Sequence, residues 1–299
     1  MQQVTIRVPA STSNLGPGFD CLGVALRIYN DITVTRGGKW PPPPVARQTA
    51  ALFFKRAGQP FSFSCSITGR ILRARGLGSS ATIRLGLLHA LNELSGRRLD
   101  RLSMFKLCAE LEGHPDNAAP ASFGGFTVAR GGHVQRFAVS QRLFFVLLIP
   151  DFEIKTAAAR RVLPARITRM AAVQNCSSAC AITAAFASRR YENLRGNFVD
   201  QLHQPFREKL IPFLPDVIVA AEKAGALGAF LSGSGPSICA ITLQGQHKVA
   251  AAMLRAVSPA PKAFGTRTRP LARSTSARTL ITTADNRGVC FHRSSATFC

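Results

Sequence analysis

The sequence predicts a mixed protein of the α+β class, built as two-layer α/β domains. The chain has 299 residues, which is enough for two domains with cores of their own. Short stretches alternate polar and apolar side chains, as half-buried strands do. Longer stretches repeat apolar side chains every three or four residues, as helices do. Glycine- and proline-rich segments separate the two kinds of stretch up to about residue 257.

The first half of the chain predicts strands and helices in turn. Alternation predicts strands at 3–8 and 28–35, joined by a loop at 9–23 that is rich in Ser, Asn, Gly and Pro. Residues 37–48 contain four consecutive prolines and predict an exposed connection that is neither helix nor central strand. The remaining elements are a strand at 61–68, helices at 81–94 and 101–112, and strands at 123–129 and 142–149.

A domain boundary is predicted at Pro150-Asp151. After about residue 257 the periodicity fades into Ser, Thr, Arg and Pro, so we expect the last thirty residues to pack poorly. The predicted organisation is therefore two domains, 1–150 and 151–257, followed by a basic tail at 258–299. Within the second domain we expect helices at 156–162, 171–188, 196–203 and 215–224 and strands at 226–231 and 238–243.

The composition, 46% hydrophobic and 18% charged, is typical of a soluble globular protein. No run of eighteen apolar residues occurs, so no membrane span is predicted. The first residues lack the basic start and apolar core of a secretory signal, so we expect a cytoplasmic protein. The eight cysteines are scattered without the paired spacing of a zinc site, which favours thiols in a reducing compartment.

The formal net charge of +23 is the least ordinary feature of the composition. Taken alone, such a charge favours a polyanionic partner such as nucleic acid. The basic residues are, however, spread along the chain, and no aromatic-rich RNA-binding strand accompanies them. A solvated surplus of charge is therefore preferred over a nucleic-acid footprint.

The stretch GLGSSAT at 76–82 follows a predicted strand and precedes a predicted helix. Backbone N–H groups in such a turn can converge on an anion at the positive end of the helix dipole. The stretch is not a P-loop, because no GK[ST] follows it. It also fits G-x-G-x-x-A, a weak dinucleotide fingerprint, with Asp100 about twenty residues on. Phosphate binding, a structural turn and a dinucleotide site all remain open on this stretch alone.

Other segments accompany this loop along the chain. PASTSNLGPGFDCLGVAL at 9–26, ELEGHPDNAAPASFGGF at 110–126 and GALGAFLSGSGPS at 225–237 stand in the order, and near the spacing, of the GHMP kinase superfamily. The runs PDFEIKTAAARRVLP at 150–164 and DQLHQPFREKLIP at 200–212 resemble the homoserine kinase family within it. This resemblance covers residues 4 to about 243, and EGHPDN and DxxHQPxR are its specific motifs.

The resemblance implies both a fold and a reaction. The fold is an N-terminal domain with a left-handed βαβ unit and a ferredoxin-like C-terminal domain, with the active site between them. The reaction is transfer of the ATP γ-phosphate to the side-chain hydroxyl of L-homoserine, a step toward threonine. Homodimers are common in the family, so self-association is a further expectation.

The same resemblance implies how a zwitterion would be bound. A carboxylate, Asp20, would hold the ammonium group, and two arginines would clamp the carboxylate in bidentate fashion. Because phosphoryl transfer asks mainly for alignment and charge neutralisation, we expect positioning and not a general base such as Asp116. The residues implied in catalysis are Asn14, Asn117 and Thr156, and those implied in substrate binding are Asn14, Asp20, Asn117, Thr156, Arg160 and Arg207.

The resemblance also implies the cofactors ATP and Mg²⁺. Oxygen ligands suit Mg²⁺, and Glu110 with Ser79 is the implied pair, with Glu112 and Ser80 as the alternatives. His203, in the DxxH pattern, is expected to be a buried structural residue. The residues implied in ATP binding are Arg75, Gly76, Leu77, Gly78, Ser79, Ser80, Ala81, Gly233, Ser234 and Gly235.

The chain departs from the family in three places. Leu72 stands where the family usually has a proline, with Arg73 and Arg75 beside it. The region 37–64 is short and proline-rich where the family helps to bind adenine, and the usual C-terminal strands are hard to find after Gly245.

Three other functions compete with this assignment. They are another small-molecule GHMP kinase, a non-catalytic GHMP-fold protein that binds nucleic acid through its charge, and, as the weakest, a dinucleotide oxidoreductase.

Overall fold

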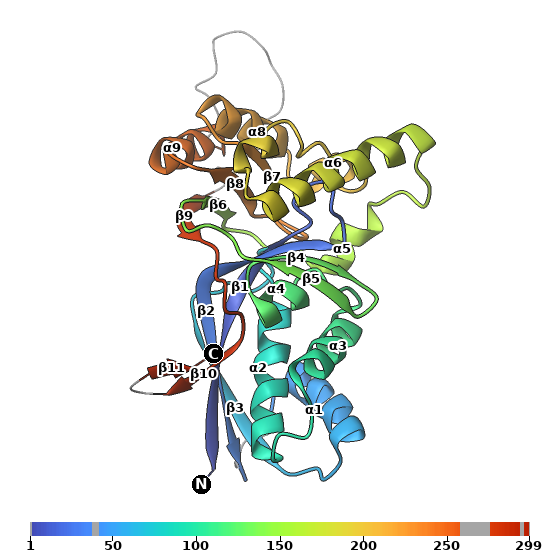
Figure 1. Cartoon of the computed structure of the whole chain (residues 1–299), viewed down its shortest axis with the longest axis vertical. Helices are drawn as coiled ribbons and strands as arrows, with labels where there is room; N and C mark the ends of the chain where they lie inside the picture. The colour runs from blue at the N-terminus through green and yellow to red at the C-terminus, as the bar shows by residue number, and fades with distance from the viewer. Residues whose placement is uncertain (1, 38–41, 258–275, 294–295, 299) are drawn as a thin grey trace.

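The structure is a computed structural model that describes residues 2–37, 42–257, 276–293 and 296–298. Two antiparallel sheets stack one above the other along the long axis of the molecule (Figure 1). The larger sheet has seven strands in the order β11-β10-β1-β2-β4-β5, and β3 also pairs with β2. Its strands are β1 (Gln3–Ser13), β2 (Leu22–Arg36), β3 (Phe63–Gly69), β4 (Phe126–Arg130), β5 (His133–Phe137), β10 (Cys290–Arg293) and β11 (Ala296–Phe298).

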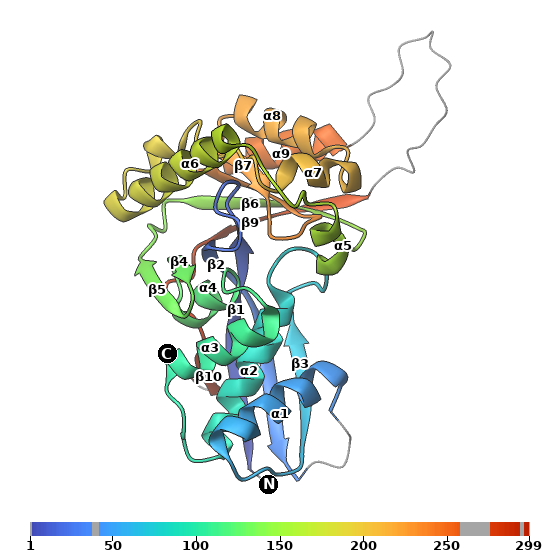
Figure 2. The ribbon, with the colours of Figure 1, turned by 90° about the vertical axis from the view of Figure 1, so that its right-hand side faces the viewer.

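Helices cover one face of the larger sheet (Figure 2). Alternate residues of β1 and β2 point into this layer, where Ile6 and Ile32 pair across the strands and are fully buried. They pack in one core with Phe53 and Phe105 from the covering helices. The helices are α1 (Pro44–Ala57), α2 (Ser79–Leu94), α3 (Arg101–Glu112) and α4 (Ala118–Phe123).

The smaller sheet has the strand order β7-β8-β6-β9, and the chain runs through it as β6, α8, β7, β8, α9, β9. This succession and strand order are those of a ferredoxin-like β-α-β-β-α-β unit, so the prediction for the second half is confirmed. The elements of this layer are β6 (Phe144–Pro150), β7 (Gly228–Leu231), β8 (Ile238–Thr242), β9 (Ala277–Thr283), α5 (Thr156–Arg161), α6 (Arg169–Ser188), α7 (Gln204–Arg207), α8 (Leu214–Lys223) and α9 (Gln246–Val257).

The described C-terminal residues join both sheets. β9 pairs with β6 over seven residues, and β10 pairs with β1 at Ile6 and Arg7. The expectation that the last thirty residues pack poorly is therefore wrong for the described ones. Strand β6 lies before the predicted domain boundary at residue 150, but it belongs to the smaller sheet, which is otherwise formed by residues after that boundary. The division of the chain into domains stays a prediction.

The loop expected at 9–23 is shorter in the structure, because β1 continues to Ser13 and β2 begins at Leu22. Two further predictions of local structure are wrong for physical reasons. Helix α1 begins at Pro44, inside the segment expected to be a non-helical connection, because a proline in the first turn loses no helical hydrogen bond; residues 38–41 lie outside the described part. The helix expected at 196–203 is absent from the described residues. There the Asp200 carboxylate accepts the backbone N–H groups of Leu202, His203 and Gln204, which turns the chain before α7.

Helix α6 alone, among the described helices, is long and apolar enough to cross a membrane by length and composition. A single such helix is weak evidence for a span, because core helices of soluble proteins have the same properties. Asn175, in the first half of α6, donates to the Pro17 carbonyl and accepts from the Gln201 amide. The helix therefore packs on the loop between β1 and β2.

Candidate active site

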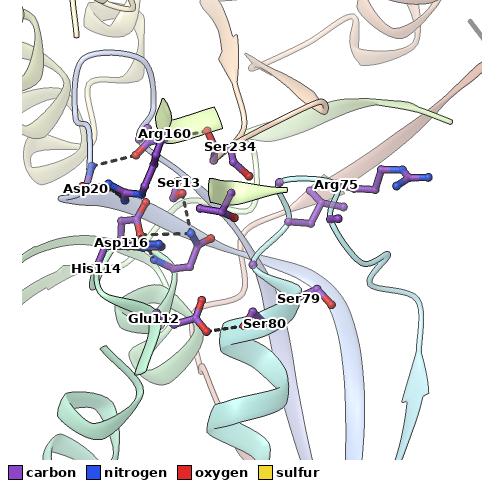
Figure 3. Close-up of a pocket in the computed structure, with 18 of the residues that line it drawn as sticks. Ser13, Asp20, Arg75, Ser79, Ser80, Glu112, His114, Asp116, Arg160 and Ser234 are labelled. Carbon is purple, nitrogen blue, oxygen red and sulfur yellow. Dashed lines mark hydrogen bonds and ion pairs between the residues drawn. The ribbon is translucent and has the colours of Figure 1, made fainter. Parts of the chain in front are cut away.

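A pocket lies where the two sheets meet, above the N-terminus of α2 (Figure 3). Four segments converge on it: the loop after β1, the 74–80 loop, the 112–117 turn and the 233–234 turn, together with two residues of α5 and one of α7. The pocket is lined by Ser13, Asn14, Phe19, Asp20, Ala74, Arg75, Gly76, Leu77, Gly78, Ser79, Ser80, Glu112, His114, Asp116, Asn117, Thr156, Arg160, Arg207, Gly233 and Ser234.

Most of the sequence-predicted site residues line this pocket. Three do not, and each has a structural place elsewhere. Ala81 is fully buried in the helical layer, and the Gly235 amide closes its own turn on the Ser232 carbonyl. Glu110 faces Arg56 across 3.8 Å with both side chains more than half exposed. The implied role of Glu110 as a metal ligand is thus not supported by its position, whereas the alternative, Glu112, lies in the pocket.

Two neighbouring side chains hold the Glu112 carboxylate at the pocket. Its Oε1 accepts from Ser80 Oγ at 2.6 Å and forms an ion pair with Arg84, 2.6 Å from Nε. The two charged side chains are each only 11% exposed, so the carboxylate is held in one orientation. Ser79 Oγ, one residue from Ser80, is buried and has no hydrogen-bond partner among the described residues. Glu112 and Ser80 thus bring a carboxylate and a hydroxyl oxygen together at the start of α2, and Ser79 lines the same pocket.

The loop before α2 depends on its glycines. Gly76 and Gly78 have φ of 71° and 68°, in the left-handed region that favours glycine. A Cβ on Gly76 would lie 2.1 Å from the Ser232 carbonyl oxygen, and one on Gly78 would lie 2.2 Å from Ser11 Oγ. The 76–78 backbone is thus packed between β1 and the 232–237 turn, leaving the first amides of α2 at the pocket.

The two glycine turns touch each other. Ser232 Oγ donates to the Gly76 carbonyl at 2.7 Å, and Asn14 Nδ2 donates to the Gly233 carbonyl at 3.0 Å. Asn14 Oδ1 also accepts from the Asp20 amide at 3.0 Å, which closes the loop after β1. Asn14 therefore fixes both the position of Asp20 and that of the 233–234 turn.

An ion pair crosses the pocket between Asp20 and Arg160. The guanidinium is bidentate, with 3.0 Å from Nη1 to Oδ2 and 2.6 Å from Nη2 to Oδ1. The side chains are about one-third exposed, so solvent and ligands reach them. A negative and a positive group thus stand side by side, as a zwitterion requires.

Arg207 is a second arginine of the pocket, and unlike Arg160 it is buried. Its Nε donates to the Ala159 carbonyl, and its Nη1 contacts the Gly233 carbonyl and His203 Nδ1 at 3.0 and 3.1 Å. Burial, followed by the charge of Arg160, lowers the pKa of Arg207 to about 10, so the group remains a cation at neutral pH. Nη2 is the nitrogen left for a carboxylate, as far as the described residues show.

His203 supports Arg207 and is neutral. Its Nε2 contacts the Gly16 carbonyl at 2.9 Å, which can only accept, so Nε2 carries the proton and Nδ1 accepts from Arg207. Burial lowers the pKa of His203 to about 4. The expectation of a buried histidine is confirmed, and its contact with Arg207 explains why both belong to one DxxHQPxR segment.

Asn117 is held from both ends of its amide. Oδ1 accepts from Ser11 Oγ at 2.8 Å, and Nδ2 donates to Ser13 Oγ at 3.0 Å and to Asp116 Oδ1 at 3.3 Å. Oδ1 keeps one lone pair for a further donor. The Asn117 side chain is therefore a fixed acceptor at the pocket floor.

Asp116 and His114 form a tight pair beside it, with 2.6 Å between Nδ1 and Oδ1. Burial alone would raise the pKa of Asp116, but the hydrogen bond and charge of His114, with hydrogen bonds from Ser13 and the Asn117 amide, together outweigh burial and lower that pKa. Burial alone would lower the pKa of His114, but Asp116 raises it. Asp116 is thus a weak base, and sequence reasoning missed this pairing although both residues stand in EGHPDN.

Arg75 differs from its expected role. Arg75 lines the pocket, but its side chain points away from the other labelled residues (Figure 3). Nε donates to the Pro150 carbonyl at 3.1 Å, and Nη1 lies 3.3 Å from Glu153. Its charge is therefore committed to this acidic segment and is not directed at the pocket.

Comparison with known proteins places this arrangement in a class. Residues 45–125 match the family model described as the GHMP kinases N-terminal domain, and residues 182–259 match that of the GHMP kinases C-terminal domain. Together they cover more than half of the chain, so the chain belongs to the GHMP kinases, and the predicted fold class is confirmed.

Closer relatives narrow the class. A homoserine kinase of Caldicellulosiruptor bescii is 40% identical over 257 residues, which is 80% of this chain and 84% of the relative. One of Synechocystis sp. is 39% identical over 264 residues, covering 81% and 86%. The crystal structure of homoserine kinase from Cytophaga hutchinsonii matches with a TM-score of 0.85 at 24% identity, covering 98% of each chain. The chain belongs to the homoserine kinase family.

Proposed function

We propose that this protein is a homoserine kinase, an ATP-dependent phosphotransferase that acts on the side-chain hydroxyl of L-homoserine and forms O-phospho-L-homoserine. The observation that carries the proposal is the placement of Asp20 beside Arg160 and Arg207 in a pocket that also opens onto the α2 N-terminus. Family membership supports the same reaction, since the similar proteins bear that name.

The substrate is expected to exchange partners with the internal ion pair. Its ammonium group would bind Asp20, and its carboxylate would bind Arg160 and the free Nη2 of Arg207. The hydroxyl would donate to Asn117 Oδ1, which keeps a lone pair. Thr156, in the first turn of α5, lines the same side of the pocket.

The phosphates of ATP would bind at the 76–80 loop. The free amides of the first turn of α2 and the positive end of its dipole favour negative charge there. The family supports ATP as the phosphate donor. Gly233 and Ser234 approach from the other side of the pocket, so the triphosphate would be enclosed by both turns.

A divalent cation fits the donor set at the start of α2. Hard cations such as Mg²⁺ take oxygen ligands, and Glu112, Ser80 and the unpartnered Ser79 Oγ supply them. Bound there, Mg²⁺ would neutralise charge on the transferring phosphate. Arg84 and Ser80 would orient the Glu112 carboxylate toward this cation.

Alignment, and not proton abstraction, is the proposed source of rate. Asp116 Oδ1 accepts three hydrogen bonds, from His114, the Asn117 amide and the Asn117 side chain. These bonds stabilise the carboxylate and make that oxygen a weaker base. A fixed hydroxyl acceptor and two arginines that hold the substrate carboxylate leave the hydroxyl oxygen facing the phosphate loop. The reaction class needs no stronger base, because its transition state is largely dissociative.

The test is ADP formation with Mg·ATP and a panel of L-homoserine, L-serine, L-threonine and mevalonate. We expect turnover with L-homoserine above all others, and none with mevalonate, which lacks the ammonium group. Absence of ADP with homoserine would refute the proposal, and preference for mevalonate would favour another GHMP kinase. Binding of RNA or DNA that weakens steeply as salt rises would favour the nucleic-acid alternative, and absence of binding at moderate salt would exclude it.

A further inference from the structure

Phe19 lies against both arginines of the pocket. It lies on the loop after β1, one residue before Asp20, and its ring lines the pocket. The Arg160 Cζ stands 5.3 Å from the ring centroid and the Arg207 Cζ 5.4 Å. Two cations from different helices, α5 and α7, therefore share one aromatic ring.

This convergence has an electrostatic cost that the ring offsets. Among the described residues, no carboxylate lies within ion-pair distance of Arg207, whereas Arg160 has Asp20. The two cations repel each other, and the charge of Arg160 is the second cause, after burial, of the lowered pKa of Arg207. The negative face of an aromatic ring attracts both guanidinium groups without neutralising either.

The ring itself is held in place. It stacks on His203 with centroids 5.2 Å apart and planes 30° apart. His203 is fixed by the Gly16 carbonyl and by Arg207.

We propose that Phe19 is a specificity-determining positioning residue, which holds the two guanidinium groups at the spacing that receives the α-carboxylate of an amino-acid substrate. The proposal rests on the proposed function and goes beyond it. Substrates without that carboxylate gain nothing from the paired cations. Phe19 therefore selects hydroxylated amino acids over hydroxylated amines.

The test compares L-homoserine with 3-amino-1-propanol, which is the same molecule without its carboxylate. Phe19→Leu removes the ring and keeps an apolar side chain. Two lost cation–π contacts predict a fall of about 5- to 30-fold in kcat/KM for homoserine, carried by KM. The value for 3-amino-1-propanol, or its dissociation constant by calorimetry if turnover is too slow, should stay within about twofold. Phe19→Tyr, which keeps the ring, should retain the discrimination.

A graded series separates electrostatics from packing. Replacing Phe19 by mono-, di- and trifluorinated phenylalanine weakens the negative ring face at nearly constant shape, so the KM for homoserine should rise with each fluorine. Phe54→Leu, which removes a ring that packs on Phe53 and Phe61 far from the pocket, is the matched control. Equal losses with both substrates, or a flat fluorine series, would overturn the proposal. Wild-type turnover of homoserine tests the proposed function separately.

Discussion

The two glutamates at the end of α3 permit a decisive comparison. Glu112→Gln keeps an oxygen that can accept from Ser80 and Arg84, but it removes the negative charge at the start of α2. If that carboxylate is the metal ligand, the loss is comparable to removal of one preorganised electrostatic group, about 3–4 kcal/mol of transition-state stabilisation. This corresponds to a fall in kcat of about 10²- to 10³-fold.

Glu110→Gln is the matched control, two residues away on the same helix. Its only described ion pair, with Arg56 at 3.8 Å, is more than half exposed, and such pairs contribute under about 1 kcal/mol. We expect kcat and KM within about twofold of wild type. The family resemblance implied Glu110 as the metal ligand, whereas the position of Glu112 in the pocket favours Glu112. The two variants therefore test one assignment against the other.

Steady-state kinetics over a Mg²⁺ titration is the first assay. Calorimetry of ADP binding with and without Mg²⁺ is the second, because it reports the metal site without turnover. Glu112→Gln should lose most of the tightening that Mg²⁺ gives to ADP, whereas Glu110→Gln should retain it. A crippled Glu110→Gln beside a nearly normal Glu112→Gln would refute the assignment to Glu112.

Other predictions follow from the charged groups of the pocket. Asp20→Asn should raise the KM for homoserine roughly 10- to 100-fold with a smaller change in kcat, because it removes the proposed partner of the ammonium group; an unchanged KM would exclude Asp20 from binding. Arg207→Lys keeps the charge but loses the fork that reaches Ala159 and Gly233, so both homoserine affinity and the melting temperature should fall, and retention of both would contradict a structural clamp. The pKa of His203 is about 4 in the folded protein, below its ordinary value of 6.5, so between these two pH values the unfolded chain binds more protons than the folded one. The free energy of unfolding should therefore drop as pH falls from about 6.5 to about 4, by up to about 3 kcal/mol. Chemical denaturation of wild type and His203→Gln at both pH values measures this; a slope that His203→Gln leaves intact would assign the effect elsewhere, for example to His89, whose pKa burial lowers to about 3.

The sequence predicts the elements whose periodicity is strong. The helix expected at 101–112 has those bounds in the structure, and that expected at 81–94 begins two residues earlier. Both have long buried faces, so the pattern of apolar side chains determines them. Helix α1 is missed because proline is unfavourable in a helix interior but harmless in its first turn.

Edge strands are harder to predict. β9 has no fully buried residue and β5 is mostly exposed, so neither shows the alternation of a half-buried strand clearly. β5 pairs with its neighbour β4 across Gly131-Gly132, whereas the stability of β9 comes from backbone pairing with β6, which is remote in sequence. Such pairing leaves little trace in local composition.

The candidate site shows the same division. The motifs identify which segments converge, and the pocket contains most of the residues they implied. Glu110 and Glu112 lie two residues apart at the C-terminal end of α3 and therefore point to different sides of the helix. Which of them faces the pocket depends on how α3 is oriented against its neighbours, and the motif does not contain that information. The direction of the Arg75 side chain depends on acidic partners at 151 and 153, which no motif contains.

The pairing of the C-terminal strands bears on how the chain tolerates shortening. A chain cut after α9 would leave the apolar strand β6 as an open edge of its sheet, because β9 is its outer neighbour. The same cut would uncover part of β1 in the other sheet, where β10 lies against it. Unpaired edges of this kind invite association between molecules. Residues that look dispensable by composition thus act as a protective border for both sheets, and their removal should cost solubility before it costs chemistry.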